Sequence, residues 1–140
     1  MPFLSHDSHW MNTMYRCALA AVLAVALMAP AAAQVQRNFP QNALRGAIVI
    51  GDFPQISLNG REAMLAPGSR IRNQDNLIVM AASLTGARLL VNYTFDIAGG
   101  LVRDVWILRP EEAAVRPWPT TIEESQTWTF DQTANAWVKP

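Results

Sequence analysis

The residues best suited to nucleophilic and metal chemistry lie near the start of this sequence. The single cysteine is Cys17, and the two histidines are His6 and His9. Residues 34–140 therefore offer neither a Ser-His-Asp relay nor a cysteine nucleophile, and they cannot build a zinc site from imidazole or thiolate ligands. The sole lysine, Lys139, lies next to the end of the chain, which is a poor position for a serine–lysine pair. We therefore predict a protein without enzymatic activity, metal or cofactor.

Carboxylates are the remaining candidates for acid–base chemistry. The sequence has two adjacent pairs, at 111–112 and 123–124, and an isolated Asp104 inside an apolar run. Glycoside hydrolysis needs two carboxyl groups that face each other across the substrate, whereas adjacent glutamates at a helix start are typical of a solvated surface. For Asp104 we expect a structural role, either an ion pair with an arginine such as Arg88 or Arg103 or the capping of a neighbouring turn. A carboxylate-based hydrolase is the least favoured functional hypothesis.

Tryptophan and arginine side chains are better candidates for a binding surface. Exposed indole rings stack on sugars or fill protein interfaces, whereas buried ones are core residues. We expect Trp106, inside an apolar run, to be buried, and Trp118, between two prolines, to be partly exposed. Arginines on one strand face could bind an anionic polysaccharide or a partner's carboxylate, although a solvated face explains them equally. The predicted ligand or partner surface comprises Trp118, Trp128, Trp137, Arg61, Arg70 and Arg72.

The charge balance narrows the classes of partner. Lysine and arginine together number 11, as do aspartate and glutamate, so the formal net charge is zero. A domain that holds nucleic acid through phosphate contacts needs a basic excess. Binding to an anionic membrane surface needs a cluster of basic residues. We therefore predict no nucleic-acid partner and no attraction to such a membrane surface.

Residues 1–33 have the layout of a secretory signal peptide. Arg16 precedes an uncharged apolar run, Cys17–Ala33, which contains a proline near its end and closes in small residues. We predict cleavage after Ala33, release into the periplasm or the medium, and no stable membrane insertion of the processed chain. The alternative is a retained membrane anchor, but a spanning helix needs about 20 apolar residues. Translation could also start at Met11.

The remaining sequence has the pattern of a β protein. Residues 34–43 are polar and are predicted as an extended linker from which Phe39 docks on the core. From Leu44 onward, β-branched and alternating apolar residues predict strands. Asn59–Gly60 is typical of a two-residue hairpin turn, and Pro67–Gly68 of a type II turn. The expected strands are 44–51, 54–58, 61–65, 69–72, 77–81, 87–95 and 101–108.

The sequence also predicts how the last two of these strands pair and where a helix lies. A glycine-rich loop joins the two strands and favours an antiparallel hairpin. We expect Tyr93 opposite Arg103 and Val91 opposite Val105 in that hairpin. A proline followed by two glutamates predicts one short helix near 110–115.

A tryptophan-rich hairpin is predicted at about 125–139. Its alternating aromatic residues resemble the second hairpin of the immunoglobulin-binding domain of protein G, and the likeness concerns folding alone. The resemblance implies that Phe130 pairs with Trp137 and that Trp128 lies across from Lys139, whose stem could cover the indole face. An irregular aromatic tail that covers the core is the alternative.

Five stretches of the sequence resemble small exported proteins of Gram-negative bacteria with no assigned function. They are FPQNALRG, LNG, LAPGSRIR, NLIVM and VNYTFDIAGGLVRDVWIL, between Phe39 and Leu108. The resemblance carries over no catalytic residue.

Together these patterns predict an all-β single domain at residues 44–140, a small barrel or sandwich of about six to eight antiparallel strands. The favoured function is an accessory or protein-binding module of the cell envelope, which acts through an open sheet edge or through the surface from Trp118 to Trp137. The alternative, from a different class, is a glycan-binding module that stacks sugars on exposed tryptophans.

Overall fold

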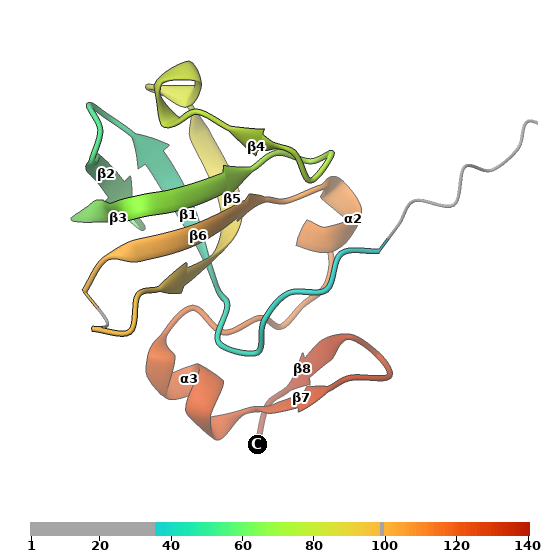
Figure 1. Cartoon of the computed structure of the whole chain (residues 1–140). Helices are drawn as coiled ribbons and strands as arrows, with labels where there is room; N and C mark the ends of the chain where they lie inside the picture. The colour runs from blue at the N-terminus through green and yellow to red at the C-terminus, as the bar shows by residue number, and fades with distance from the viewer. Residues whose placement is uncertain (1–35, 99) are drawn as a thin grey trace, which may run out of the picture. The chain divides into compact units, whose positions relative to one another are not determined.

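Five strands close on themselves into a small barrel (Figure 1). Around the barrel, β1 pairs with β2, β2 with β3, β3 with β6, β6 with β5, and β5 with β1. All of these pairs are antiparallel except β3–β6, which is parallel. This strand order with one parallel pair is that of the five-stranded OB barrel. The strands are β1 (Leu44–Ile50), β2 (Gln55–Leu58), β3 (Arg61–Arg72), β5 (Arg88–Phe95) and β6 (Val102–Ile107).

The computed structural model describes residues 36–98 and 100–140. Arg37–Pro140 form one compact unit. The predicted signal peptide at 1–33 lies outside the described residues. Within the described part of the chain, no helix is long and apolar enough to cross a membrane. The prediction of a small all-β barrel is confirmed, whereas the prediction that every strand pairs antiparallel is wrong for β3 and β6.

The two predicted turns around β3 behave differently. Asn59 and Gly60 both have positive φ, 52° and 79°, as a two-residue hairpin turn between β2 and β3 requires. Pro67–Gly68, in contrast, does not end a strand, because β3 continues through it to Arg72. The pairing register with β6 shifts between Leu65 and Arg70 instead. The proline and glycine thus bend one long strand, so that its first half pairs with β2 and its second half with β6 and β4 (Ile78–Val79).

The hairpin of β5 and β6 forms in a register that differs from the predicted one. Tyr93 pairs with Val105 and Val91 with Ile107, so the predicted partners were wrong by two residues. A register shift after Thr94 leaves Arg103 as the extra residue of β6. Because the shift is two residues, Val91, Tyr93 and Val105 still face the barrel interior, whereas the bulge exposes Arg103 and buries Val102.

Two clusters of buried side chains hold the unit together. The first fills the barrel with inward-facing aliphatic residues and one tyrosine. A second, aromatic cluster lies between the barrel and the C-terminal segment. The barrel cluster comprises Leu44, Ile48, Ile50, Ile56, Leu58, Leu65, Ile71, Val91, Tyr93, Val102 and Val105. The aromatic cluster comprises Phe39, Ala43, Leu108, Trp118 and Trp137, with Trp106, Trp128 and Phe130 packed against it.

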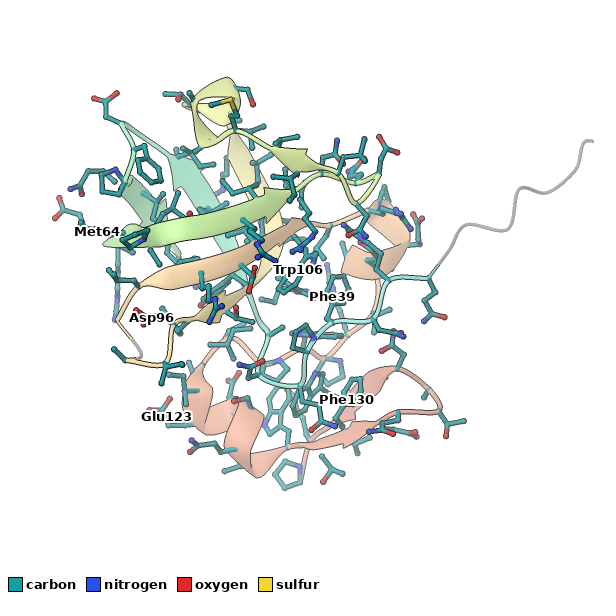
Figure 2. All side chains as sticks on the ribbon, in the orientation of Figure 1. Phe39, Met64, Asp96, Trp106, Glu123 and Phe130 are labelled. Atoms are coloured by element: carbon teal, nitrogen blue, oxygen red, sulfur yellow. The ribbon has the colours of Figure 1, made fainter. Side chains whose placement is uncertain are left out.

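The segment before β1 is part of this second cluster. Phe39 docks on the core as predicted: its ring lies 5.9 Å from the rings of both Trp106 and Trp118 in edge contacts (Figure 2). Because residues 37–43 belong to the same compact unit as the barrel, the domain boundary that we placed at residue 44 falls inside that unit.

The C-terminal segment contains two short helices and a hairpin. The helix predicted near 110–115 is α2 (Pro110–Ala113). The sequence analysis did not predict α3 (Ile122–Thr127), which Thr121 caps by accepting a hydrogen bond from the Glu124 N–H at 3.2 Å. The remaining elements are η1 (Ala81–Leu84), β7 (Thr129–Asp131) and β8 (Ala136–Val138).

The predicted pairs of the tryptophan-rich hairpin are present. Phe130 pairs with Trp137 between β7 and β8. Lys139 Nζ lies 5.1 Å from the centroid of the Trp128 ring. The segment at 129–138 is therefore a paired hairpin and not an irregular tail.

A buried ion pair attaches the N-terminal segment and α2 to the barrel. Arg37 Nε donates to Glu112 Oε1 at 2.8 Å, and the other guanidinium nitrogens donate to the carbonyls of Asn73 at 2.9 Å and Ile107 at 2.7 Å. Burial raises the pKa of Glu112. The hydrogen bonds from the Arg37 side chain and the Arg109 N–H, together with the positive charges of Arg37 and Arg109, lower the pKa by more than burial raises it. The pKa of Glu112 therefore lies below its ordinary value.

Glu112→Gln is expected to lower the free energy of unfolding by about 3 kcal/mol at neutral pH, because it leaves the Arg37 charge buried without its counter-ion. A group with a lowered pKa stabilises the fold above its unfolded pKa and stops doing so as the pH falls through the folded value. The difference from the wild type should therefore shrink in acid. Urea unfolding at several pH values measures it, with the exposed neighbour Glu111→Gln as the control. Equal effects of the two substitutions would contradict this account.

Candidate functional site

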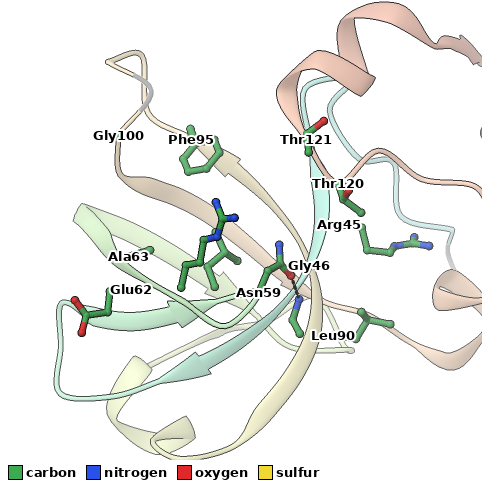
Figure 3. Close-up of a pocket in the computed structure, with 13 residues that line it drawn as sticks. Arg45, Gly46, Asn59, Glu62, Ala63, Leu90, Phe95, Gly100, Thr120 and Thr121 are labelled. Atoms are coloured by element: carbon green, nitrogen blue, oxygen red, sulfur yellow. Dashed lines mark hydrogen bonds between the residues drawn. The ribbon is translucent and has the colours of Figure 1, made fainter.

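A groove of about 860 Å³ lies where the β2–β3 turn, the end of β5 and the start of α3 come together (Figure 3). We refer to it as the mouth groove. Its lining is largely apolar, with a polar and charged rim. The apolar lining comes from Ala47, Leu58, Ala63, Leu90 and Phe95, and the rim from Asn59, Arg61, Glu62, Thr120 and Thr121.

The wall of the mouth groove depends on how the β2–β3 turn meets β1. Asn59 N–H donates to the Ala47 carbonyl at 2.8 Å, and Asn59 Oδ1 accepts from the Ala47 N–H at 2.9 Å. The pairing of β1 with β2 ends at Ile48 and Leu58. The Asn59 side chain thus supplies to Ala47 the oxygen acceptor that the carbonyl of a partner strand would otherwise supply. A Cβ added at Gly46 would lie 2.8 Å from Asn59 Oδ1 and 3.1 Å from the Tyr93 ring. Only glycine leaves room for this contact.

Phe95 separates the mouth groove from a smaller neighbouring hollow of about 370 Å³. The ring is half-buried and meets Tyr93 edge-on at 5.4 Å. The loop that follows it presents Ile97, which is 99% exposed, and Ile122 at the edge of the smaller hollow is 43% exposed. Asp96 Oδ1 holds this loop by accepting from the Gly100 N–H at 3.2 Å. Two exposed isoleucines therefore lie near the groove, Ile97 in the loop after Phe95 and Ile122 at the smaller hollow.

The rim of the mouth groove carries both signs of charge. Arg61 and Glu62 are successive residues at the start of β3, and both are exposed. Neither belongs to the ion pairs found among the described residues. A rim with one free cation and one free anion suits a segment with mixed polar and charged side chains better than a polyanion.

A further hollow, of about 550 Å³, lies beside the C-terminal hairpin. We refer to it as the tail pocket. It shares Arg45 and Thr120 with the mouth groove. Its other lining residues are Arg116, Pro117, Trp118, Glu124, Trp128 and Lys139.

Arg45 forms the common wall of the mouth groove and the tail pocket. It extends from β1, and main-chain and amide oxygens surround its guanidinium. Nη1 donates to the Val115 carbonyl at 2.6 Å, Nη2 to the Glu112 carbonyl at 3.1 Å, and Nε to Asn92 Oδ1 at 3.2 Å. The guanidinium carbon lies 4.9 Å from the centroid of the Trp118 ring. No carboxylate of the described residues forms an ion pair with it.

The structure does not gather the predicted surface tryptophans at one exposed site. The expectation that Trp118 is partly exposed is wrong: it is 6% exposed, and its Nε1 donates to the Ala43 carbonyl at 3.0 Å. Trp137 is 4% exposed. Both fill the aromatic cluster, because Phe39 and the hairpin close over them. Trp128 is half-buried and lines the tail pocket. Trp106, which we had expected to be buried, is also only half-buried.

The predicted arginines are also divided. Arg61 lies at the mouth groove, whereas Arg70 and Arg72 are on the second half of β3 and line neither hollow. Arg72 stacks over Trp106 at 5.7 Å and pairs with Asp104 at 3.8 Å. We had expected Arg88 or Arg103 to be the partner of Asp104. The parallel pairing of β3 with β6 brings Arg72 there instead.

One glutamate of each pair that we weighed for acid–base chemistry has structural contacts. Glu112 pairs with Arg37, and Glu124 Oε2 accepts from the Thr120 N–H at 2.8 Å. Among the described residues, no three histidine, cysteine, aspartate or glutamate side chains lie close enough together to hold a metal ion.

In the six-stranded sheet of the described residues, one strand edge remains unpaired. It belongs to β4, which pairs with β3 alone. Leu77, Ile78 and Met80 in and beside this strand are 62%, 66% and 78% exposed. The strand has only two residues, so it offers few main-chain groups to an added strand.

Comparison of the chain with protein-family models, with curated proteins and with solved structures found no match.

Gly46→Ala is expected to destabilise the protein by about 1–3 kcal/mol, because the added methyl group displaces the Asn59 amide from Ala47. In an Asn59→Gly background, which tolerates the positive φ at this position, the same change should cost clearly less. Urea unfolding of the four proteins measures this coupling. Equal costs in both backgrounds would show that the contact does not shape this wall of the groove.

Proposed function

We propose that the protein is an exported, non-enzymatic binding module of the bacterial cell envelope, and that the mouth groove holds an extended segment of another envelope protein. The observation that carries the proposal is the combination of an apolar lining with a rim that presents Arg61 and Glu62. A fitting segment places apolar side chains against Leu90 and Phe95 and a charged side chain at either end.

The exposed loop beside the groove supports a protein partner. Ile97 is almost wholly exposed, so a partner that covered it would gain the free energy of burying its apolar surface. Ile97 lies in the loop between Phe95 and Gly100, two residues that line the groove. A partner segment that leaves the groove past Phe95 would cover it.

Three other hypotheses have less support. The glycan-binding hypothesis needs exposed tryptophan rings on which sugars stack. Two of the three predicted rings, those of Trp118 and Trp137, are buried. Strand addition at β4 would gain few main-chain hydrogen bonds. A carboxylate-based hydrolase would need an opposed carboxylate pair, whereas Asp104 is paired with Arg72.

Photo-crosslinking in cells that export the full chain tests the proposal. A benzoylphenylalanine at position 90 or 97, in place of the exposed Leu90 or Ile97, should form an adduct with one and the same envelope protein. The matched control is position 133, where exposed Thr133 lies in the β7–β8 turn away from the groove. Arg61→Glu should lower the adduct yield by roughly tenfold, because it reverses one charge of the rim.

Absence of an adduct from positions 90 and 97, or the same set of adducts from position 133, would refute the proposal. An unchanged yield in the Arg61→Glu protein would refute the part assigned to the rim.

A further inference from the structure

We propose that the tail pocket is a second, independent site, and that it binds an acidic sugar: a pyranose ring against Trp128, with its carboxylate between Arg116 and Lys139. The ligand class follows from two features of the pocket, an excess of positive charge and a flat indole surface beside it. The site lies on the other side of Arg45 from the mouth groove, so it does not depend on the function proposed there.

The first feature is the charge balance of the pocket wall. Arg45, Arg116 and Lys139 line it, against the single carboxylate of Glu124. None of the three cations belongs to the ion pairs found in the described part of the chain. Glu124 Oε2 already accepts from the Thr120 N–H at 2.8 Å and from Thr120 Oγ1 at 3.2 Å. The wall therefore carries three positive charges against one negative charge.

Arg45 is the fixed part of this positive charge. Its hydrogen bonds go to carbonyl and amide oxygens, which orient the guanidinium but do not neutralise it. Burial, and after it the charge of Arg116, lower the pKa of Arg45 to about 10, while Glu112 opposes the shift. The group stays protonated at neutral pH, in mutual repulsion with Arg116. An anion bound beside Arg116 relieves that repulsion, so the pocket favours a negative ligand over a neutral one.

The second feature is the indole ring of Trp128. The ring is half-buried, so the aromatic cluster fixes its position while part of it borders the pocket. Lys139 Nζ lies 5.1 Å from its centroid on an exposed, flexible stem. The apolar face of a sugar ring packs on such a surface, and Lys139 can turn from the ring to a carboxylate. A volume of about 550 Å³ admits one or two sugar units.

Titration of the purified protein with trigalacturonic acid tests the site, observed through the indole N–H resonance of Trp128 and by calorimetry. We expect saturable binding that shifts this resonance and weakens as salt is added. Arg116→Gln should weaken binding roughly 10-fold or more, because it removes a charge-assisted hydrogen bond. The matched control, Arg103→Gln, removes an exposed arginine on β6 that lines neither hollow and should leave binding unchanged.

Two comparison ligands separate the parts of the claim. Neutral maltotriose should not bind measurably, and equal binding of the two trisaccharides would overturn the role of charge. Inorganic phosphate should bind much more weakly than trigalacturonic acid, and equal affinity would overturn the role of the ring. No binding of trigalacturonic acid, or binding that Arg116→Gln leaves unchanged in a protein with native circular dichroism, would overturn the site itself.

Discussion

The guanidinium of Arg45 joins the barrel to the C-terminal third of the chain. It extends from β1, contacts Asn92 on β5, and donates to the carbonyls of Glu112 in α2 and Val115 just after α2, while it stacks on Trp118. Two further hydrogen bonds cross the same junction: the Arg45 N–H donates to the Pro119 carbonyl at 2.8 Å, and the Trp118 indole donates to Ala43. A buried cation is costly without partners, so this set of oxygens fixes where the C-terminal segment docks.

The docking of the C-terminal segment on the barrel determines where the protein has hollows that could bind a ligand. In the closed barrel, each of the five strands is paired on both edges, so a ligand strand has no free barrel edge to pair with. Binding sites are therefore expected at the ends of the barrel and on the segment that packs against it. The C-terminal segment contributes to both hollows: its residues Thr120 and Thr121 complete the mouth groove, and most of the residues that line the tail pocket also belong to it. Arg45 lines both hollows, and neither Arg45 nor Arg116 belongs to an ion pair among the described residues, which is the physical basis of the second site.

Local patterns in the sequence predicted the features that depend on neighbouring residues. The Asn59–Gly60 turn needs positive φ at two positions, and the pairing of Phe130 with Trp137 was implied by the resemblance to the protein G hairpin. The pattern Thr121-x-x-Glu124 would have indicated the missed helix α3. Features that depend on distant segments were not predictable. The bend of β3 at Pro67–Gly68 and the position of Arg72 beside Asp104 both follow from parallel pairing with β6. Of the residues at the mouth groove, the predicted surface named only Arg61, because several separate segments build its walls.

The central claim is that the barrel and the C-terminal segment fold as one cooperative unit. Native-state hydrogen exchange tests it most directly, with the Trp118 indole N–H and the Arg45 amide as probes of the junction and the Leu65 amide, which donates to Pro54 at 2.8 Å, as the probe of the barrel. We expect all three to exchange with the same opening free energy, within about 1 kcal/mol. If the two junction protons exchange through an opening that is several kcal/mol easier than that of Leu65, the C-terminal segment is a loosely attached tail and both proposed sites lose their common wall.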